Sequence, residues 1–98
     1  MTEPAPRIRA ALVGSAPSGP YVIAVFCDGS ARRYDLGPLL DFGPFAPLRD
    51  GAQLRDFTVL PYGHGIEWAC GGDISARHIH ASGEPVDLTF AEPEAVAA

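Results

Sequence analysis

The sequence predicts a small α+β domain with an antiparallel β-sheet, a central hairpin and one or two short helices. Its 98 residues are enough for one domain. Apolar runs of strand length recur along the chain, and Asp28-Gly29 separates two of them, which is a strong short-range signal for a hairpin. The middle of the chain is broken by Pro and Gly, so it has room only for single helical turns.

The first strand is predicted over residues 7–13, because apolar side chains there recur at every second position. The side chains that would share its buried face are those of Ile8, Ala10 and Leu12. The next segment, 14–20, contains two Gly, two Pro and two Ser and is therefore predicted to be a loop.

The hairpin is predicted to join strands over residues 21–27 and 30–36. The first is an uninterrupted apolar run rich in β-branched and aromatic residues, which suits a central strand. A two-residue turn at Asp28-Gly29 would place Ile23 opposite Tyr34. A three-residue loop would shift this register by one and exchange the two faces. The two-residue turn is the favoured alternative.

The second half of the chain is predicted to alternate short strands and turns. A helical turn begins at Pro38, and a strand covers residues 57–60. Residues 66–68 alternate apolar and polar, as a half-buried strand does. Ser75 has the hydroxyl of a helix N-cap, and Ile79 would anchor the short helix that follows.

The domain organisation follows from these elements. Residues 1–6 are expected to be a flexible lead-in, 7–83 the single α+β domain, and 84–98 an edge strand with a frayed acidic and Ala-rich tail. The apolar positions that alternate in this last strand are Val86, Leu88 and Phe90.

Charge and hydropathy exclude several classes of function. The 7 basic and 12 acidic residues give a net charge of −5, which repels the phosphates of nucleic acids. Apolar runs are too short to span a membrane. The two cysteines and an N-terminus without the features of a signal peptide favour a reduced, cytoplasmic protein.

Side chains that could carry chemistry do not form a recognisable motif. A metal-dependent or enzymatic protein would use the His, Cys and Asp side chains of the second half: His64, Cys70, Asp73 and His78. The spacings typical of zinc sites and metalloproteases are missing, and so is the serine-nucleophile motif. No catalytic residue, metal site or cofactor is therefore predicted. Cys27, at the end of an apolar run, is expected to be buried and inert.

Seven residues are candidates for a structural or interaction role: Asp28, Gly29, Tyr34, Trp68, Gly71, Gly72 and Asp73. The first two would form the hairpin turn. Trp68 would anchor the core, and only an exposed Trp would indicate a contact surface. Gly71-Gly72 stands before a helix start, where backbone N–H groups can bind an anion.

The order of the motifs resembles a bacterial family, the domain of unknown function 2442. The segments that carry the resemblance are the hairpin Val25–Leu36, Leu39-Leu40, Gly43–Asp50, Phe57–Val59 and Gly65–Ser75. Members usually close with Trp-Pro-x-Gly-x-Asp-Leu, and here Ala69 replaces the Pro. The resemblance covers roughly residues 7–80 and implies a small α+β domain with an antiparallel sheet and short helices. It supplies no catalytic residues, and some members neighbour genes suggestive of toxin–antitoxin pairs.

These observations predict a non-enzymatic interaction or regulatory module. An antitoxin-like partner of a small toxin is the narrower alternative, and a small metal-dependent or enzymatic protein is the alternative from another class. The partner is expected to be a second copy or a small protein, since the edges of a small sheet expose unpaired backbone groups that invite another strand. Neither nucleic acid nor membrane is an expected partner.

Overall fold

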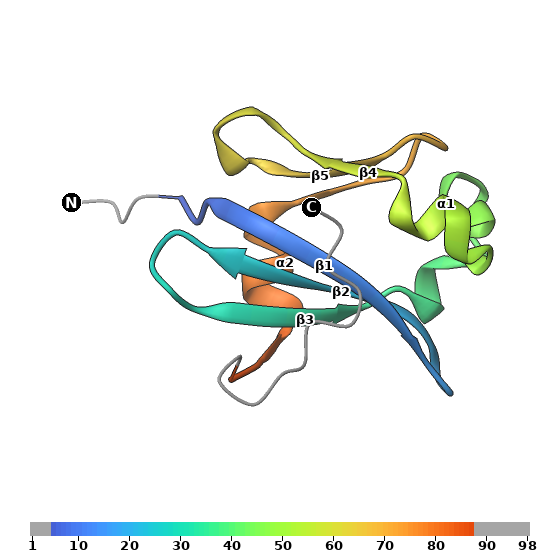
Figure 1. Cartoon of the computed structure of the whole chain (residues 1–98), viewed down its shortest axis with the longest axis horizontal. Helices are drawn as coiled ribbons and strands as arrows, with labels where there is room; N and C mark the ends of the chain where they lie inside the picture. Colours follow the sequence, from blue (N-terminus) through green and yellow to red (C-terminus); the bar gives the residue numbers. More distant parts are fainter. Residues whose placement is uncertain (1–4, 88–98) are drawn as a thin grey trace.

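The computed structural model describes residues 5–87, which form two antiparallel sheets (Figure 1). The first sheet has the order β1-β2-β3-β7. Its strands are β1 (Ile8–Ala16), β2 (Gly19–Phe26), β3 (Ala31–Asp35) and β7 (Glu84–Pro85). The second sheet has the order β4-β5-β6. Its strands are β4 (Phe57–Val59), β5 (Gly65–Trp68) and β6 (Asp73–Ser75).

The helical elements are short. The two α-helices are α1 (Gly51–Arg55) and α2 (Ala76–Ser82), and the 3-10 helices are η1 (Gly37–Leu39), η2 (Gly43–Arg49) and η3 (Pro61–Gly63). Helix α2 lies against β3 and against both β5 and β6, so it connects the two sheets. The predicted α+β class and central hairpin are confirmed. Among the described residues no helix is long and apolar enough to cross a membrane.

The first hairpin corrects the prediction of a loop over 14–20. Only Pro17 and Ser18 lie outside the strands, because Ala16 already pairs with Gly19. Gly19 has a φ of +128°, which makes the tight reversal accessible. Pro20 fits at the start of β2 because it supplies only its carbonyl, which accepts a hydrogen bond from the N–H of Leu36 at 2.9 Å.

The buried face of β1 also differs from the predicted one. The pairing register shifts between Ile8 and Ala10, as in a β-bulge. Beyond this shift the inward side chains are those of Ala11 and Val13. Ala10 is exposed and Leu12 is half-buried.

The central hairpin exists, but its predicted register is wrong. Ile23 pairs with Arg33 and Val22 with Tyr34, as the three-residue loop requires. The N–H of Phe26 donates to the Ser30 carbonyl at 2.8 Å, so Cys27, Asp28 and Gly29 form the loop. Within this loop only Gly29 has a positive φ, +90°. A three-residue loop needs no second residue in that conformation.

Two consequences follow from this loop. Cys27 is exposed in the turn rather than buried, which corrects the expectation drawn from the apolar run before it. Tyr34 faces the same side of the sheet as Val22, which is fully buried, and therefore points toward α2.

The core is shared by both sheets. Trp68 is 1% exposed, and its indole Nε1 donates a hydrogen bond to the Leu54 carbonyl at 2.8 Å. Ile66 lies on the same face of β5, whereas Glu67 between them is exposed. Trp68 therefore has a core position rather than one on a contact surface.

At the C-terminal end, β7 pairs with Arg32 and Arg33 of β3, and the N–H of Val86 donates to the Ala31 carbonyl at 3.0 Å. Leu88 and Phe90, on which the rest of the expected edge strand depends, lie outside the described residues. So do residues 1–4 of the lead-in and 88–98 of the tail.

Candidate functional site

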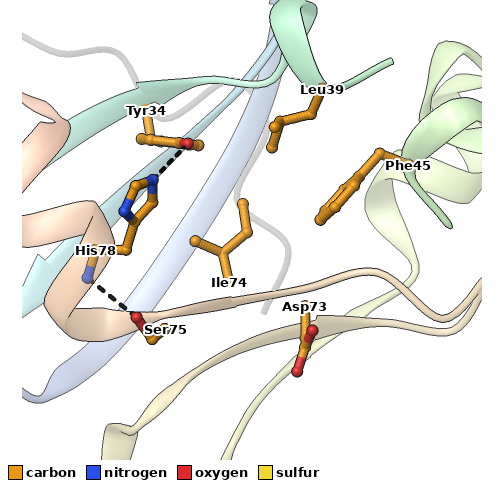
Figure 2. Close-up of a pocket in the computed structure, with 7 residues that line it drawn as sticks. All are labelled: Tyr34, Leu39, Phe45, Asp73, Ile74, Ser75 and His78. Atoms are coloured by element: carbon orange, nitrogen blue, oxygen red, sulfur yellow. Dashed lines mark hydrogen bonds between the residues drawn. The ribbon is translucent and has the colours of Figure 1, made fainter. Parts of the chain in front are cut away.

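An open hollow of about 420 Å³ lies where the two sheets meet. Five elements supply its lining: β3, η1, η2, β6 and α2. The lining residues are Tyr34, Leu39, Phe45, Asp73, Ile74, Ser75 and His78 (Figure 2). The volume is at the lower end of the range found for ligand pockets, so it can hold a large side chain or a small molecule.

A hydrogen-bonded pair forms the polar wall of the hollow. The Tyr34 hydroxyl lies 2.8 Å from Nε2 of His78, and the two rings meet edge to face with centroids 5.3 Å apart (Figure 2). Burial raises the pKa of Tyr34, because desolvation disfavours the phenolate. The phenol therefore keeps its proton at neutral pH and remains a hydrogen-bonding group.

Helix α2 begins after the N-cap Ser75, as the sequence predicts, and this cap binds the backbone of His78. The Ser75 hydroxyl oxygen accepts a hydrogen bond from the backbone N–H of His78 at 3.1 Å. Ile79 is a buried residue of the same helix. His80, two residues further, meets the ring of Phe26 at 5.0 Å instead. The two histidines thus have separate surroundings.

The other walls are apolar. Ile74 lies between the Tyr34–His78 pair and Phe45, with Leu39 on the remaining side (Figure 2). The Phe45 ring is held against Trp68, with centroids 6.5 Å apart. Gly72 makes room for this ring, because a Cβ there would lie 2.8 Å from Phe45 Cε1.

Strand β6 presents an unpaired edge along the hollow. The bonds from Ala76 N–H to the His64 carbonyl and from Trp68 N–H to the Gly72 carbonyl flank the pair Ile66–Ile74. Because bonded pairs alternate in an antiparallel ladder, the N–H and C=O of Ile74 point toward β5.

The backbone groups of Asp73 and Ser75 consequently point away from β5. The Ser75 carbonyl is available to α2, as expected of an N-cap. The N–H and C=O of Asp73 and the N–H of Ser75 have no partner among residues 5–87. Both residues are exposed.

The structure brings two of the seven sequence candidates, Tyr34 and Asp73, to the hollow. Gly72 supports it from behind. Gly71 has a φ of +113° in the β5–β6 turn, where its N–H donates to the Trp68 carbonyl at 2.9 Å. Asp28 and Gly29 form the hairpin turn, and the Asp28 carboxylate accepts hydrogen bonds from the Ser30 N–H and hydroxyl.

The proposed metal or catalytic set is not brought together. Asp73 and His78 both line the hollow, but the Asp73 carboxylate points to the other side of β6 (Figure 2). The His64 ring meets Tyr62 edge to face, and the Cys70 thiol donates to the Pro44 carbonyl. In the described part of the chain no group of three or more His, Cys, Asp or Glu side chains could hold a metal ion.

Sequence reasoning missed Leu39, Phe45 and Ile74 as parts of a site. They belong to three different elements, and no spacing connects them. Phe45 carries one weak signal, since a large apolar residue in a Pro- and Gly-rich segment has few local partners.

The chain matches a known protein family. A family model described as "Protein of unknown function (DUF2442)" matches residues 17–83, a range that includes every residue lining the hollow. Neither the curated proteins nor the solved structures contain a significant match to the chain.

Proposed function

The chain belongs to the DUF2442 family of proteins of unknown function, and from this premise we propose that it is a non-enzymatic protein-interaction module. Its contact surface is the hollow between the two sheets. The hollow receives an apolar side chain of a partner protein, and the exposed edge of β6 contacts the backbone beside that side chain.

One observation carries the proposal: apolar walls line an open hollow. Leu39 and Phe45 are only half-buried, and Ile74 lies between them and the polar wall. Covering apolar surface is favourable by roughly 25 cal/mol per Å². A single large side chain seated in such a pocket is the usual energetic centre of a protein interface.

The polar side chains around the hollow support recognition rather than catalysis. His78 is engaged with Tyr34, and the Ser75 hydroxyl caps α2. The Asp73 carboxylate points to the other side of β6 from Ile74 (Figure 2). The Tyr34–His78 pair, held by its hydrogen bond, can orient a ligand without donating or removing a proton.

Affinity capture from cells that encode the protein tests the proposal. The wild-type chain is compared with Leu39→Asp, which places a charge in the hollow, and with Gln53→Asp, which adds the same charge on an exposed face of α1. We expect a captured protein that is retained by Q53D and depleted at least about tenfold by L39D.

Circular dichroism of both variants controls for folding. If no protein distinguishes L39D from Q53D while both variants remain folded, the hollow is not the contact surface and the proposal is wrong.

A further inference from the structure

We infer that the partner segment binds as an extended antiparallel strand added to β6, with an apolar residue followed directly by a basic one. The inference rests on the proposed function of the hollow and specifies what fills it. Three features of the structure lead to it: the free backbone groups of β6, the position of Ile74, and the charge of Asp73.

The backbone groups define the pairing. A residue opposite Asp73 can accept from the Asp73 N–H and donate its own N–H to the Asp73 carbonyl, which is the closely spaced bond pair of an antiparallel ladder. The residue opposite Ser75 accepts from the Ser75 N–H. These groups are two residues apart on one strand, as the ladder requires.

The position of Ile74 defines the anchor. Residues directly opposite each other in antiparallel strands project their side chains to the same face. The partner residue opposite Ile74 therefore directs its side chain into the hollow, toward Leu39 and Phe45. The volume of about 420 Å³ is sufficient for a large apolar side chain.

Asp73 defines the neighbouring residue. Its carboxylate lies on the other face of β6 from Ile74 (Figure 2). The partner residue opposite Asp73 directs its side chain to this same face. Glu67 of β5 pairs with Asp73 and is exposed on the same face, and the chain carries a net charge of −5. A Lys or Arg at this position of the partner is complementary to this negative charge. In its N-to-C direction, the partner therefore has any residue opposite Ser75, an apolar residue opposite Ile74 and a basic residue opposite Asp73.

The other strand edges are less suited to this role. β1 and β4 contact each other, and η3 also contacts β1 with Gly63 against the backbone of Ile8, so these two edges are partly covered. β7 has two residues and ends with Pro85, which cannot donate to a ladder. Among the described strands, β6 combines free backbone groups with an adjacent apolar hollow.

The test uses the synthetic pentapeptide acetyl-Thr-Thr-Leu-Lys-Thr-amide, titrated to millimolar concentration into the ¹⁵N-labelled chain and followed by NMR. We expect saturable shifts of the Asp73 and Ser75 amides. Two methylated peptides form the matched pair. Methylation of the lysine N–H removes the bond to the Asp73 carbonyl and should weaken binding about tenfold.

Methylation of the leucine N–H should change binding less than about threefold, because that group points away from β6. Serine in place of the leucine should weaken binding about tenfold or more. The protein variant Asp73→Asn should weaken it about twofold to fivefold and remove most of its salt dependence.

If both methylated peptides bind equally well, or if the unmodified peptide gives no saturable shift at Asp73 and Ser75, strand addition is wrong. The capture experiment with L39D decides independently whether the hollow is a contact surface. Loss of capture with L39D together with a failed peptide titration would therefore overturn this inference and leave the proposed function standing.

Discussion

Strands β1 and β6 lie at edges of the two sheets, and the fold covers these edges to different extents. β1 has nine residues, and β4 and η3 contact it. β6 has three residues, and Asp73 and Ser75 at its ends are exposed. A long exposed edge invites uncontrolled pairing between chains. In this protein β4 and η3 cover part of the long edge, and the short edge stays open beside an apolar hollow.

The cover of β1 comes from the second sheet. Strand β4 and helix η3 contact β1, and Gly63 lies directly against the backbone of Ile8. Trp68 fills the core that β1 shares with the second sheet. Variants at these positions test whether the contrast between the two edges depends on this packing.

Trp68→Ala should have the largest effect. Removing a fully buried Trp leaves a cavity in the shared core, and the free energy of unfolding should fall by about 3–5 kcal/mol. Urea denaturation measures this change. Phe42→Ala is the control, since Phe42 is 60% exposed and should lose less than about 1 kcal/mol. Equal losses in the two variants would show that Trp68 does not hold the sheets together.

Gly63→Ala should act next most strongly, and it acts on the cover itself. A Cβ at Gly63 would overlap the Ile8 carbonyl oxygen, and the φ of +69° disfavours any side chain. We expect a loss of about 2 kcal/mol. Amide hydrogen exchange should accelerate at Ala11 and Val13. In β6 it should change only as much as the global loss of stability accounts for.

The control for this variant is Gly43→Ala, because nothing lies within 4 Å of the added Cβ. Unchanged exchange in β1 of G63A would mean that η3 does not protect this edge.

Gly29→Val should have a smaller effect that leaves the contrast between the edges intact. Gly29 lies at the turn between β2 and β3 with a φ of +90° and open space around it, so the change strains only the backbone. A β-branched residue at this φ should cost about 1 kcal/mol or more. Thermal or urea unfolding measures it, and Gly29→Asn should lose less because Asn tolerates positive φ. A neutral G29V would contradict the observed turn.

The smallest effect concerns acid. Hydrogen bonds from the Ser30 hydroxyl and then from the Ser30 N–H lower the pKa of Asp28. The folded-state pKa is thus below the unfolded one, so the contribution is complete above the ordinary aspartate pKa, about 3.9. It is lost as the pH falls through the folded value.

The unfolding free energy of the wild type should therefore decline slightly more on acidification below about pH 4 than that of Asp28→Asn. Urea unfolding of both chains across this range measures the difference. NMR titration measures the pKa of Asp28 directly. A value at or above the ordinary one would contradict this prediction.

Local signals in the sequence were sufficient for several elements. Ser75 and Ile79 lie a few residues apart, and together they define the start and the buried face of α2. The apolar–polar–apolar order of residues 66–68 determines which side of β5 is buried. Asp28-Gly29 indicates a hairpin independently of how the rest of the chain folds. The α+β class followed from such short-range preferences.

Other features were decided only by tertiary structure. The Asp28-Gly29 turn permits a two-residue or a three-residue loop. The three-residue loop directs Tyr34 inward, where it contacts α2. Gly and Pro in 14–20 are compatible with a loop or with strand ends, and pairing with β2 selects the latter. The hollow needs five elements, and no local pattern connects them. Conformational preferences act over a few residues, whereas burial and strand pairing join residues far apart in the chain, so the sequence determined the elements and the fold determined the site.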